Sequence, residues 1–271
     1  MIRSSSALTI LTLSALAATY GCGQEDAEDL GSAVAQQEGM PTTDTGINGE
    51  PYPAAPYLSE LEGTLLFGDI WQRPGLSLRD RSLVTVAVTQ ALYRTEELRE
   101  YLGRALDNGV TREEIAELMT HVSMYSGWPT GSNASRVAID VYGRRGLEFP
   151  PPAEPVTLEV DLRGQRPGYP AIPYLAALTR SLLFDETDGI WSRPVLSPRD
   201  RSVITVAVGQ ALYATDQLRG HVGRALDNGV TPAEIQEIIT HVTFYAGWPT
   251  GSNAARVVEE VFADRGVEVG G

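Results

Sequence analysis

The chain has 271 residues, a hydrophobic content of 42% and a formal net charge of −14 at pH 7. This length and composition suffice for one large domain or two small ones with a buried core. The negative charge argues against nucleic acid as a partner, because phosphates require a basic surface. An anionic substrate would have to be held by local arginines against the overall field.

Residues 1–22 have the features of an export signal. A positive charge at Arg3 precedes a short apolar stretch over 7–18, which suits a signal peptide better than a membrane-spanning helix. Cys22 follows Gly21, and this pair resembles a bacterial lipobox, although the two residues before Gly21 depart from the usual pattern. We expect Cys22 to be the lipidated first residue of the mature chain. An ordinary secretory signal with an incidental cysteine is the alternative.

Residues 23–50 are rich in Gln, Glu, Asp, Gly and Thr and contain few large apolar side chains. Such a segment cannot bury enough surface to offset its ordering entropy, so we predict a disordered tether. A glycine rather than an aspartate follows the cysteine, which favours the outer membrane. The prediction is an exported, lipid-anchored protein facing the periplasm, which contacts the membrane through its lipid only.

The rest of the chain is a duplicated domain. Aligning 71–147 with 191–267 gives 49 identities in 77 positions, far beyond chance, and a repeat of this length is a domain rather than a solenoid unit. The predicted boundaries are 51–149 for repeat 1, 150–168 for a proline-rich linker and 169–271 for repeat 2. Residues 156–160 are a candidate for a short strand in the linker.

Within each repeat the predicted elements are helices. Hydroxyl caps followed by an acid three residues later open two of them, at Ser197 and Thr231 in repeat 2. The first is apolar nearly all round, which indicates a buried helix. Pro249 is expected to end the third. The helices expected in repeat 2 are 197–212, about 216–227, 231–247 and about 251–264. The prediction is an all-α chain of two tandem bundles with four to five helices each.

One stretch of thirteen residues occurs twice and concentrates the chemically capable side chains. It reads HVSMYSGWPTGSN at 121–133 and HVTFYAGWPTGSN at 241–253. Cys22 is the single cysteine, so the folded part has no redox pair and no thiolate metal site. The histidines are His121, His221 and His241, without clustered acids, so we expect no metal and no cofactor. The alternative is a metal site formed by His121 and His241, if these two histidines meet at the interface between the repeats.

The order of motifs RDRSxxTVAV, LRxH, DNGVTxxEI and HVxxYxGWP resembles the carboxymuconolactone decarboxylase family. The resemblance covers roughly 52–147 and 170–267. It implies the all-helical fold shared with alkylhydroperoxidase D-like proteins, and decarboxylation or related lactone chemistry without a cofactor on a small carboxylate or lactone. The peroxidase branch of this fold uses a Cys-x-x-Cys pair before a histidine. The matching region ends at His221 without cysteine, which excludes peroxidase chemistry.

The resemblance places the family's proton-handling histidine at His221, whereas repeat 1 has Tyr101 there. We therefore expect repeat 2 to carry the working site and repeat 1 to support it. An imidazole near neutral pH can deliver the proton that a carbon needs after losing CO2. The candidate catalytic residues are His221, His241 and His121, and the candidate substrate-binding residues are Arg193, Arg201, Tyr245, Trp248 and Asn253. The two arginines would clamp a carboxylate.

Structural roles are the alternative for most of these residues. His121 and His241 follow apolar helix faces and suit buried, hydrogen-bonded positions. Trp248 suits a core or an interface, and the arginines of 79–81 and 199–201 suit a local charge network. For the whole chain, the alternative is a non-catalytic binding or scaffold lipoprotein that reuses the fold. Family members with one repeat often form hexameric rings, so we expect an internal pseudo-dimer of repeats and a homotrimer of chains.

Overall fold

The computed structural model describes residues 52, 54–152, 172–187 and 189–267. The predicted signal, the tether, the candidate strand and most of the linker lie outside these residues. Apart from Pro56 at the start of α2, all the features discussed below lie in the unit Tyr57–Gly271. The described residues form α-helices and a few short π or 3-10 segments, with no strand among them, which confirms the predicted all-α fold.

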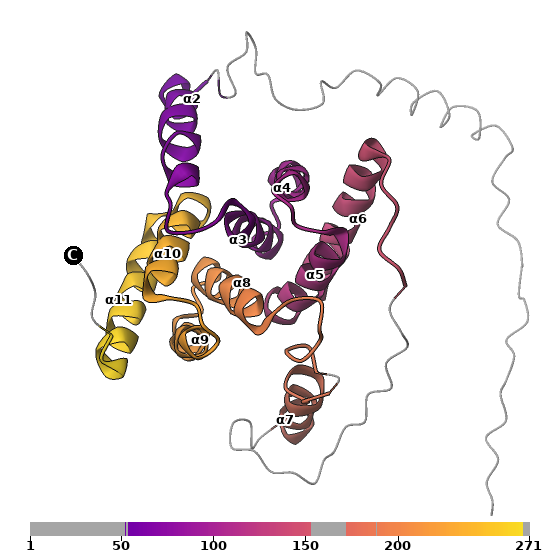
Figure 1. Cartoon of the computed structure of the whole chain (residues 1–271), viewed down its shortest axis with the longest axis vertical. Coiled ribbons are helices and arrows are strands. Elements are labelled where there is room, and N and C mark those ends of the chain that lie inside the picture. The colour runs from indigo at the N-terminus through magenta and orange to yellow at the C-terminus, as the bar shows by residue number, and fades with distance from the viewer. Residues whose placement is uncertain (1–51, 53, 153–171, 188, 268–271) are drawn as a thin grey trace, which may run out of the picture. The chain divides into compact units, whose positions relative to one another are not determined.

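Each repeat is a bundle that begins with a short helix and continues through four longer ones (Figure 1). The elements of repeat 1 are α2 (Pro56–Leu61), η2 (Glu62–Phe67), η3 (Ile70–Gln72), α3 (Leu78–Ala91), α4 (Thr95–Asp107), α5 (Arg112–Ser126) and α6 (Trp128–Arg145). The elements of repeat 2 are α7 (Pro173–Leu178), η4 (Thr179–Leu183), α8 (Pro198–Ala211), α9 (Thr215–Asp227), α10 (Pro232–Ala246) and α11 (Trp248–Arg265). No helix in the described part of the chain is both long and apolar enough to span a membrane.

The helix boundaries follow from the capping residues. The Ser197 hydroxyl accepts a hydrogen bond from the Asp200 backbone N–H at 3.0 Å, and Thr231 forms a complete capping box with Glu234. One expectation needs correction, because α11 begins at Trp248 rather than near residue 251. A proline is tolerated in the first turn of a helix, where its missing N–H would have no partner, so Pro249 opens α11 after the break at Gly247.

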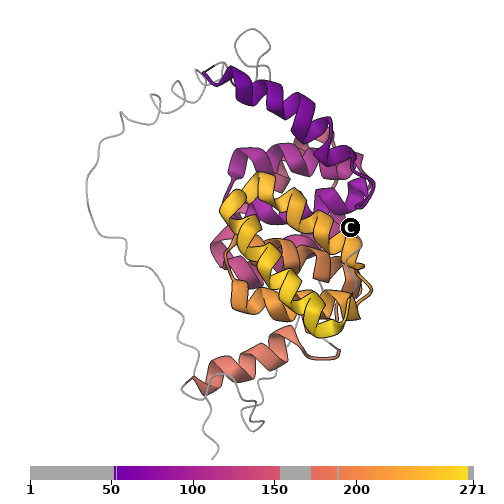
Figure 2. The ribbon, with the colours of Figure 1, turned by 90° about the vertical axis from the view of Figure 1, so that its left-hand side faces the viewer.

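The two repeats share one interior. Helices α3 and α8 pack against each other at the centre, between α5 and α6 on one side and α10 and α11 on the other (Figure 1). Figure 2, turned toward the α11 side, shows α11 lying across the front of this bundle. Each hydrophobic core also takes side chains from the other repeat: Ile204 and Val208 enter the core of repeat 1, and Val84 and Val88 enter that of repeat 2. The repeats therefore form an internal pseudo-dimer.

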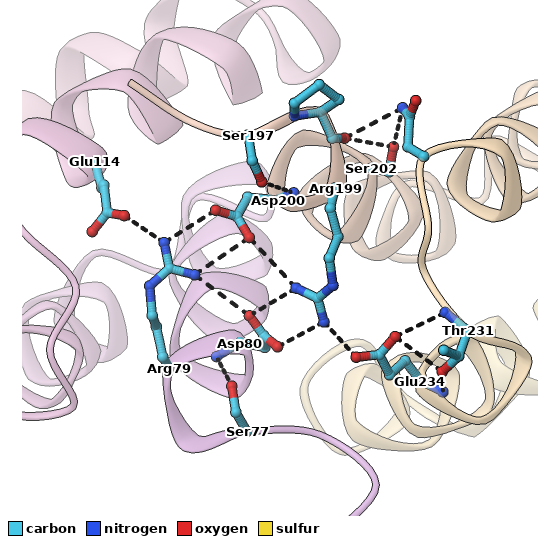
Figure 3. A network of polar contacts seen from close by, with 12 residues as sticks. Ser77, Arg79, Asp80, Glu114, Ser197, Arg199, Asp200, Ser202, Thr231 and Glu234 are labelled. Carbon is cyan, nitrogen blue, oxygen red and sulfur yellow. Dashed lines mark hydrogen bonds and ion pairs between the residues drawn. The ribbon is translucent and has the colours of Figure 1, made fainter. Parts of the chain in front are cut away.

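The starts of α3 and α8 are joined by a network of ion pairs (Figure 3). Arg79 binds Asp200 at 3.1 Å and also pairs with Glu114. Arg199 makes the equivalent contact with Asp80, at 2.9 Å. The structure thus shows the charge network that was the alternative expected for these first-turn arginines, and the network ties one repeat to the other.

Candidate functional site

The third long helix of each repeat lies against the first long helix of the other, and two polar clusters form where they meet. The duplication relates these two clusters, so each position in one has a counterpart in the other. Site A, where α10 meets α3, comprises Trp71, Arg73, Arg81, Thr85, Tyr101, Glu237, His241 and Tyr245. Site B, where α5 meets α8, comprises Trp191, Arg193, Arg201, Thr205, His221, Glu117, His121 and Tyr125.

A buried glutamate and two arginines form the base of each site. In site B, Arg201 donates to Glu117 at 2.9 Å, and the Nε of Arg193 donates to the same carboxylate at 2.9 Å. Arg201 is 0% exposed, so this ion pair is removed from water. Arg193 and Arg201, predicted to clamp a substrate carboxylate, are therefore already bound to a carboxylate from the other repeat.

His241 uses both ring nitrogens within site A. Its Nε2 lies 2.8 Å from the Thr85 hydroxyl, which itself donates to the carbonyl oxygen of Arg81. The hydroxyl oxygen therefore accepts from an Nε2–H. The other nitrogen, Nδ1, lies 3.3 Å from Arg81, which can only donate, so Nδ1 must accept and the imidazole is neutral. Burial and the charge of Arg81 lower the pKa of His241 to about 3.

His121 repeats this arrangement in site B. Its Nε2 lies 2.8 Å from Thr205, its Nδ1 lies 3.4 Å from Arg201, and burial lowers its pKa to about 3. Both of these histidines are fully buried and fully used by structural hydrogen bonds. This burial and bonding supports the alternative expectation, in which His121 and His241 orient other residues rather than exchange protons.

His221 differs from the other two histidines. It lies on α9, half-buried, with its ring stacked on Trp191 at 6.2 Å between centroids and edge-on to Tyr125 at 5.5 Å. Its Nδ1 is buried and has no hydrogen-bond partner among the described residues. Burial and the charge of Arg224 lower its pKa to about 4. His221 is thus a neutral imidazole at pH 7 that no structural hydrogen bond occupies at Nδ1.

Tyr101 closes the equivalent position in site A. The Tyr245 hydroxyl accepts from the Trp71 indole at 2.8 Å and donates to the Tyr101 hydroxyl at 3.2 Å. Trp71 and Tyr101 are only 2% and 5% exposed, whereas Trp191 and His221 of site B are half-buried. Site B keeps the first of these bonds, from Trp191 to Tyr125 at 2.9 Å. In site A, the hydrogen-bonded hydroxyls of Tyr245 and Tyr101 therefore fill this position. The matching side chains of site B are more exposed to solvent.

The predicted grouping of the candidate residues is corrected by this arrangement. His221 and His241 belong to different sites, and the histidine beside His221 is His121 of repeat 1. Repeat 2 does not carry a site alone, because each site takes one helix face from the other repeat. The sequence feature that indicates the α5 side of site B is the spacing of Glu117, His121 and Tyr125. They stand at i, i+4 and i+8, which places all three on one face of a helix.

The remaining candidates are spread over three places. Arg193 and Arg201 lie in site B and Tyr245 lies in site A. Trp248 is 64% exposed beside a surface hollow of about 310 Å³ between α10 and α11. The side-chain oxygen of Asn253 accepts from Arg256 at 2.7 Å. Trp248 and Asn253 therefore stand outside both sites.

Metal-binding side chains do not gather in the part of the chain that the structure describes. No three or more His, Cys, Asp or Glu side chains lie together there in a way that could hold an ion. His121 contacts Thr205 and Arg201, and His241 contacts Thr85 and Arg81, so the two histidines serve separate clusters.

Comparison with known proteins identifies the family to which the chain belongs. The model of the Carboxymuconolactone decarboxylase family matches residues 58–140 and 177–260, once in each repeat, so the chain belongs to this family. The 4-carboxymuconolactone decarboxylase of Acinetobacter baylyi is 44% identical over 81 residues, which are 30% of this chain and 60% of that protein.

Two further relatives match the chain over a comparable number of residues. The nitrosuccinic acid decarboxylase of Metarhizium robertsii is 39% identical over 64 residues, covering 24% of this chain and 45% of that protein. An uncharacterized 15.0 kDa protein of Paracoccus denitrificans is 36% identical over 84 residues, 30% of this chain and 63% of that protein. The chain thus spans less than two thirds of the length of each of these three relatives.

Proposed function

We propose that site B is the active site of a cofactor-independent decarboxylase, or of an enzyme of related lactone or carboxylate chemistry, with His221 as the acid/base. The observation that carries the proposal is a half-buried, neutral imidazole whose Nδ1 has no hydrogen-bond partner among the described residues. Membership of the family, and two relatives named as decarboxylases, support this class of reaction.

The proposed reaction needs one proton transfer and one place for negative charge. The bond between the carboxylate and its carbon breaks, CO2 leaves, and the electron pair passes into a conjugated carbonyl. His221 then delivers a proton to the carbon and regains one from water. Burial and the charge of Arg224 lower its pKa to about 4, and an anionic substrate would raise that pKa because opposite charge favours the imidazolium.

The other residues of site B position these groups. The bond from Trp191 fixes the Tyr125 hydroxyl next to His221, where it can donate to the oxygen on which charge develops. His121 and Arg201 hold the neighbouring wall through Thr205 and Glu117. In this proposal the two buried histidines are positioning residues, and site A is structural.

The direct test is an assay of the purified protein for CO2 release from 4-carboxymuconolactone and from nitrosuccinate, the substrates in the relatives' names. His221→Ala should abolish any turnover, and Tyr101→Phe, at the matched position of site A, should leave it unchanged. Turnover that survives in His221→Ala would contradict the proposal. A wild-type protein that binds such compounds without consuming them would favour the alternative of a non-catalytic binding lipoprotein.

We also propose that the chain is exported and anchored by lipid at Cys22, which lies outside the described residues. The order of Arg3, an apolar stretch and Gly21-Cys22 supports this. In cells expressing the full chain, radiolabelled palmitate should enter the wild-type protein and be absent from Cys22→Ala. Equal labelling of the two proteins would rule out this anchor.

We further propose a homotrimer, in which three chains supply six repeats. Each repeat exposes a tryptophan beside a hollow between its last two helices: Trp128 is 75% exposed and Trp248 is 64% exposed. Light scattering of the protein after removal of the lipid anchor should give three times the chain mass at micromolar concentration. The mass of a single chain across that range would contradict this assembly.

A further inference from the structure

Arg224 lies next to His221 on α9 and carries a positive charge. It follows His221 by three residues on α9, so both side chains lie on the same face of the helix. Its guanidinium is 4.8 Å from the ring centre of Trp191 and 5.0 Å from that of Phe184. Within the described residues, the Arg224 side chain makes no ion pair and no hydrogen bond. Asp227, the acid one turn further on, is bound to Arg265 at 2.8 Å and interacts with Arg224 only through its charge, without a hydrogen bond or ion pair.

The matched arginine of repeat 1 is occupied. Arg104 lies over the rings of Phe67, at 4.4 Å, and Trp71, at 5.4 Å, as Arg224 lies over their counterparts. Its Nη2 donates to the carboxylate of Glu100 at 3.4 Å. The residue of repeat 2 that corresponds to Glu100 is Gly220, which has no side chain to offer.

Two adjacent differences between the repeats therefore act together. Glu100 becomes Gly220, which leaves the arginine without a carboxylate, and Tyr101 becomes His221, which replaces the sealing hydroxyl with an imidazole. The surrounding tryptophan, phenylalanine and arginine are the same in both repeats. The position that loses its internal carboxylate is thus the one that gains an acid/base group.

We propose that Arg224 binds a carboxylate of the substrate in site B, so that the protein acts on small molecules with at least one free carboxylate. This rests on the proposed function for the site. Arg201 is fully buried against Glu117, and the same carboxylate offsets the charge of Arg193, which donates to it through Nε. A guanidinium can donate two parallel hydrogen bonds through its edge while its face stays on the rings of Trp191 and Phe184.

The position of Arg224 also explains how an acidic protein captures an anion. The chain carries a formal charge of −14, so a substrate carboxylate needs a local cation that no internal acid neutralises. Arg224 and His221 both lie against Trp191, so a carboxylate held by the arginine brings the rest of a small molecule toward the imidazole. Arg224 is half-buried, which leaves its donors within reach of solvent.

Gly220 offers a test that leaves Arg224 in place. A Cβ added there would meet nothing within 4 Å, so Gly220→Glu and Gly220→Gln should both fold and differ only in charge. Succinate is the probe, and its binding to the full-length protein is measured by calorimetry, with dimethyl succinate as the neutral control. Gly220→Glu should supply the missing carboxylate and weaken succinate binding, whereas Gly220→Gln should leave it within about twofold.

Arg224→Ala should weaken succinate binding by about 10- to 100-fold, the usual effect of losing hydrogen bonds to a charged group. Arg104→Ala, at the matched position of site A, should leave binding within about twofold. Binding that is unchanged in Arg224→Ala, or no binding of succinate to the wild type, would overturn the proposal. His221→Ala separates the two proposals, because it should keep succinate binding and lose turnover. If Arg224→Ala binds succinate normally and His221→Ala loses turnover, the proposed role of Arg224 is rejected and the proposed role of His221 stands.

Discussion

Replacing His221 with tyrosine is expected to lower decarboxylation by about 10²–10⁴-fold, the usual contribution of general acid–base catalysis. The substitution copies into site B the residue that site A carries at Tyr101. There the hydroxyl accepts from Tyr245 at 3.2 Å, and burial raises the pKa of Tyr101 far above neutrality. A phenol of this kind cannot exchange a proton at pH 7, so the variant should fold and bind substrate but turn over slowly.

The ratio kcat/KM for the most reactive compound of the assay, measured at pH 7, checks this expectation. Tyr101→Phe is the matched control and should stay within about twofold of the wild type, because site A has no role in the reaction. The urea midpoint of the His221→Tyr variant should show that the fold is intact. A rate within about twofold of the wild type for His221→Tyr would show that another group transfers the proton.

Acidification from pH 6.5 to pH 5 is expected to lower the free energy of unfolding by about 3–6 kcal/mol. Burial holds the pKa of His121 and His241 at about 3 and that of His221 at about 4 in the folded protein. In the unfolded chain a histidine titrates near 6.5. Below that pH the unfolded state binds more protons than the folded state, so stability is complete above about 6.5 and falls toward the folded pKa values.

Urea unfolding at pH 7, 6 and 5 measures this dependence. Each buried histidine should contribute a slope of up to about 1.4 kcal/mol per pH unit in this range. His121→Gln keeps one donor and one acceptor near Thr205 and Arg201 but removes the titration, so its slope should be smaller by about that amount. A wild-type stability that stays constant from pH 7 to pH 5 would show that these imidazoles are not held neutral.

Much of the fold was predictable because local chemistry determines it. Hydroxyl caps, first-turn prolines and Asn-Gly stops set the helix boundaries, and the apolar character of α8 indicated its central position. The start of α11 was misplaced because Trp248-Pro249 ends one helix and opens the next, and a proline serves both purposes.

The composition of the sites was not predictable from either repeat alone. Helices α3 and α8 have nearly the same sequence, and α5 contacts both of them. Helical spacing places Glu117, His121 and Tyr125 on one face, but it does not say which of two similar helices that face will meet. The packing of the whole chain decides this, and it brings Glu117 to Arg201, which lies 84 positions further along the sequence.

The same limit explains the choice of arginines. A sequence shows which side chains carry charge but not which charges are already paired. The prediction of Arg193 and Arg201 as clamps therefore could not include their hydrogen bonds to Glu117. The sequence alone does not single out Arg224, because both repeats have an arginine at this position. The informative difference was one turn earlier, where Glu100 of repeat 1 becomes Gly220 of repeat 2.

In the proposed mechanism, the working site joins His221 of repeat 2 to the α5 face of repeat 1. Comparing Tyr125→Phe with Tyr245→Phe tests it most directly, because these are matched tyrosines and only Tyr125 lies against His221. In the decarboxylation assay, kcat should fall at least about tenfold in Tyr125→Phe, from loss of a hydrogen bond to developing charge, and stay within about twofold in Tyr245→Phe. The reverse order would place the reaction in site A and contradict the proposed role of His221.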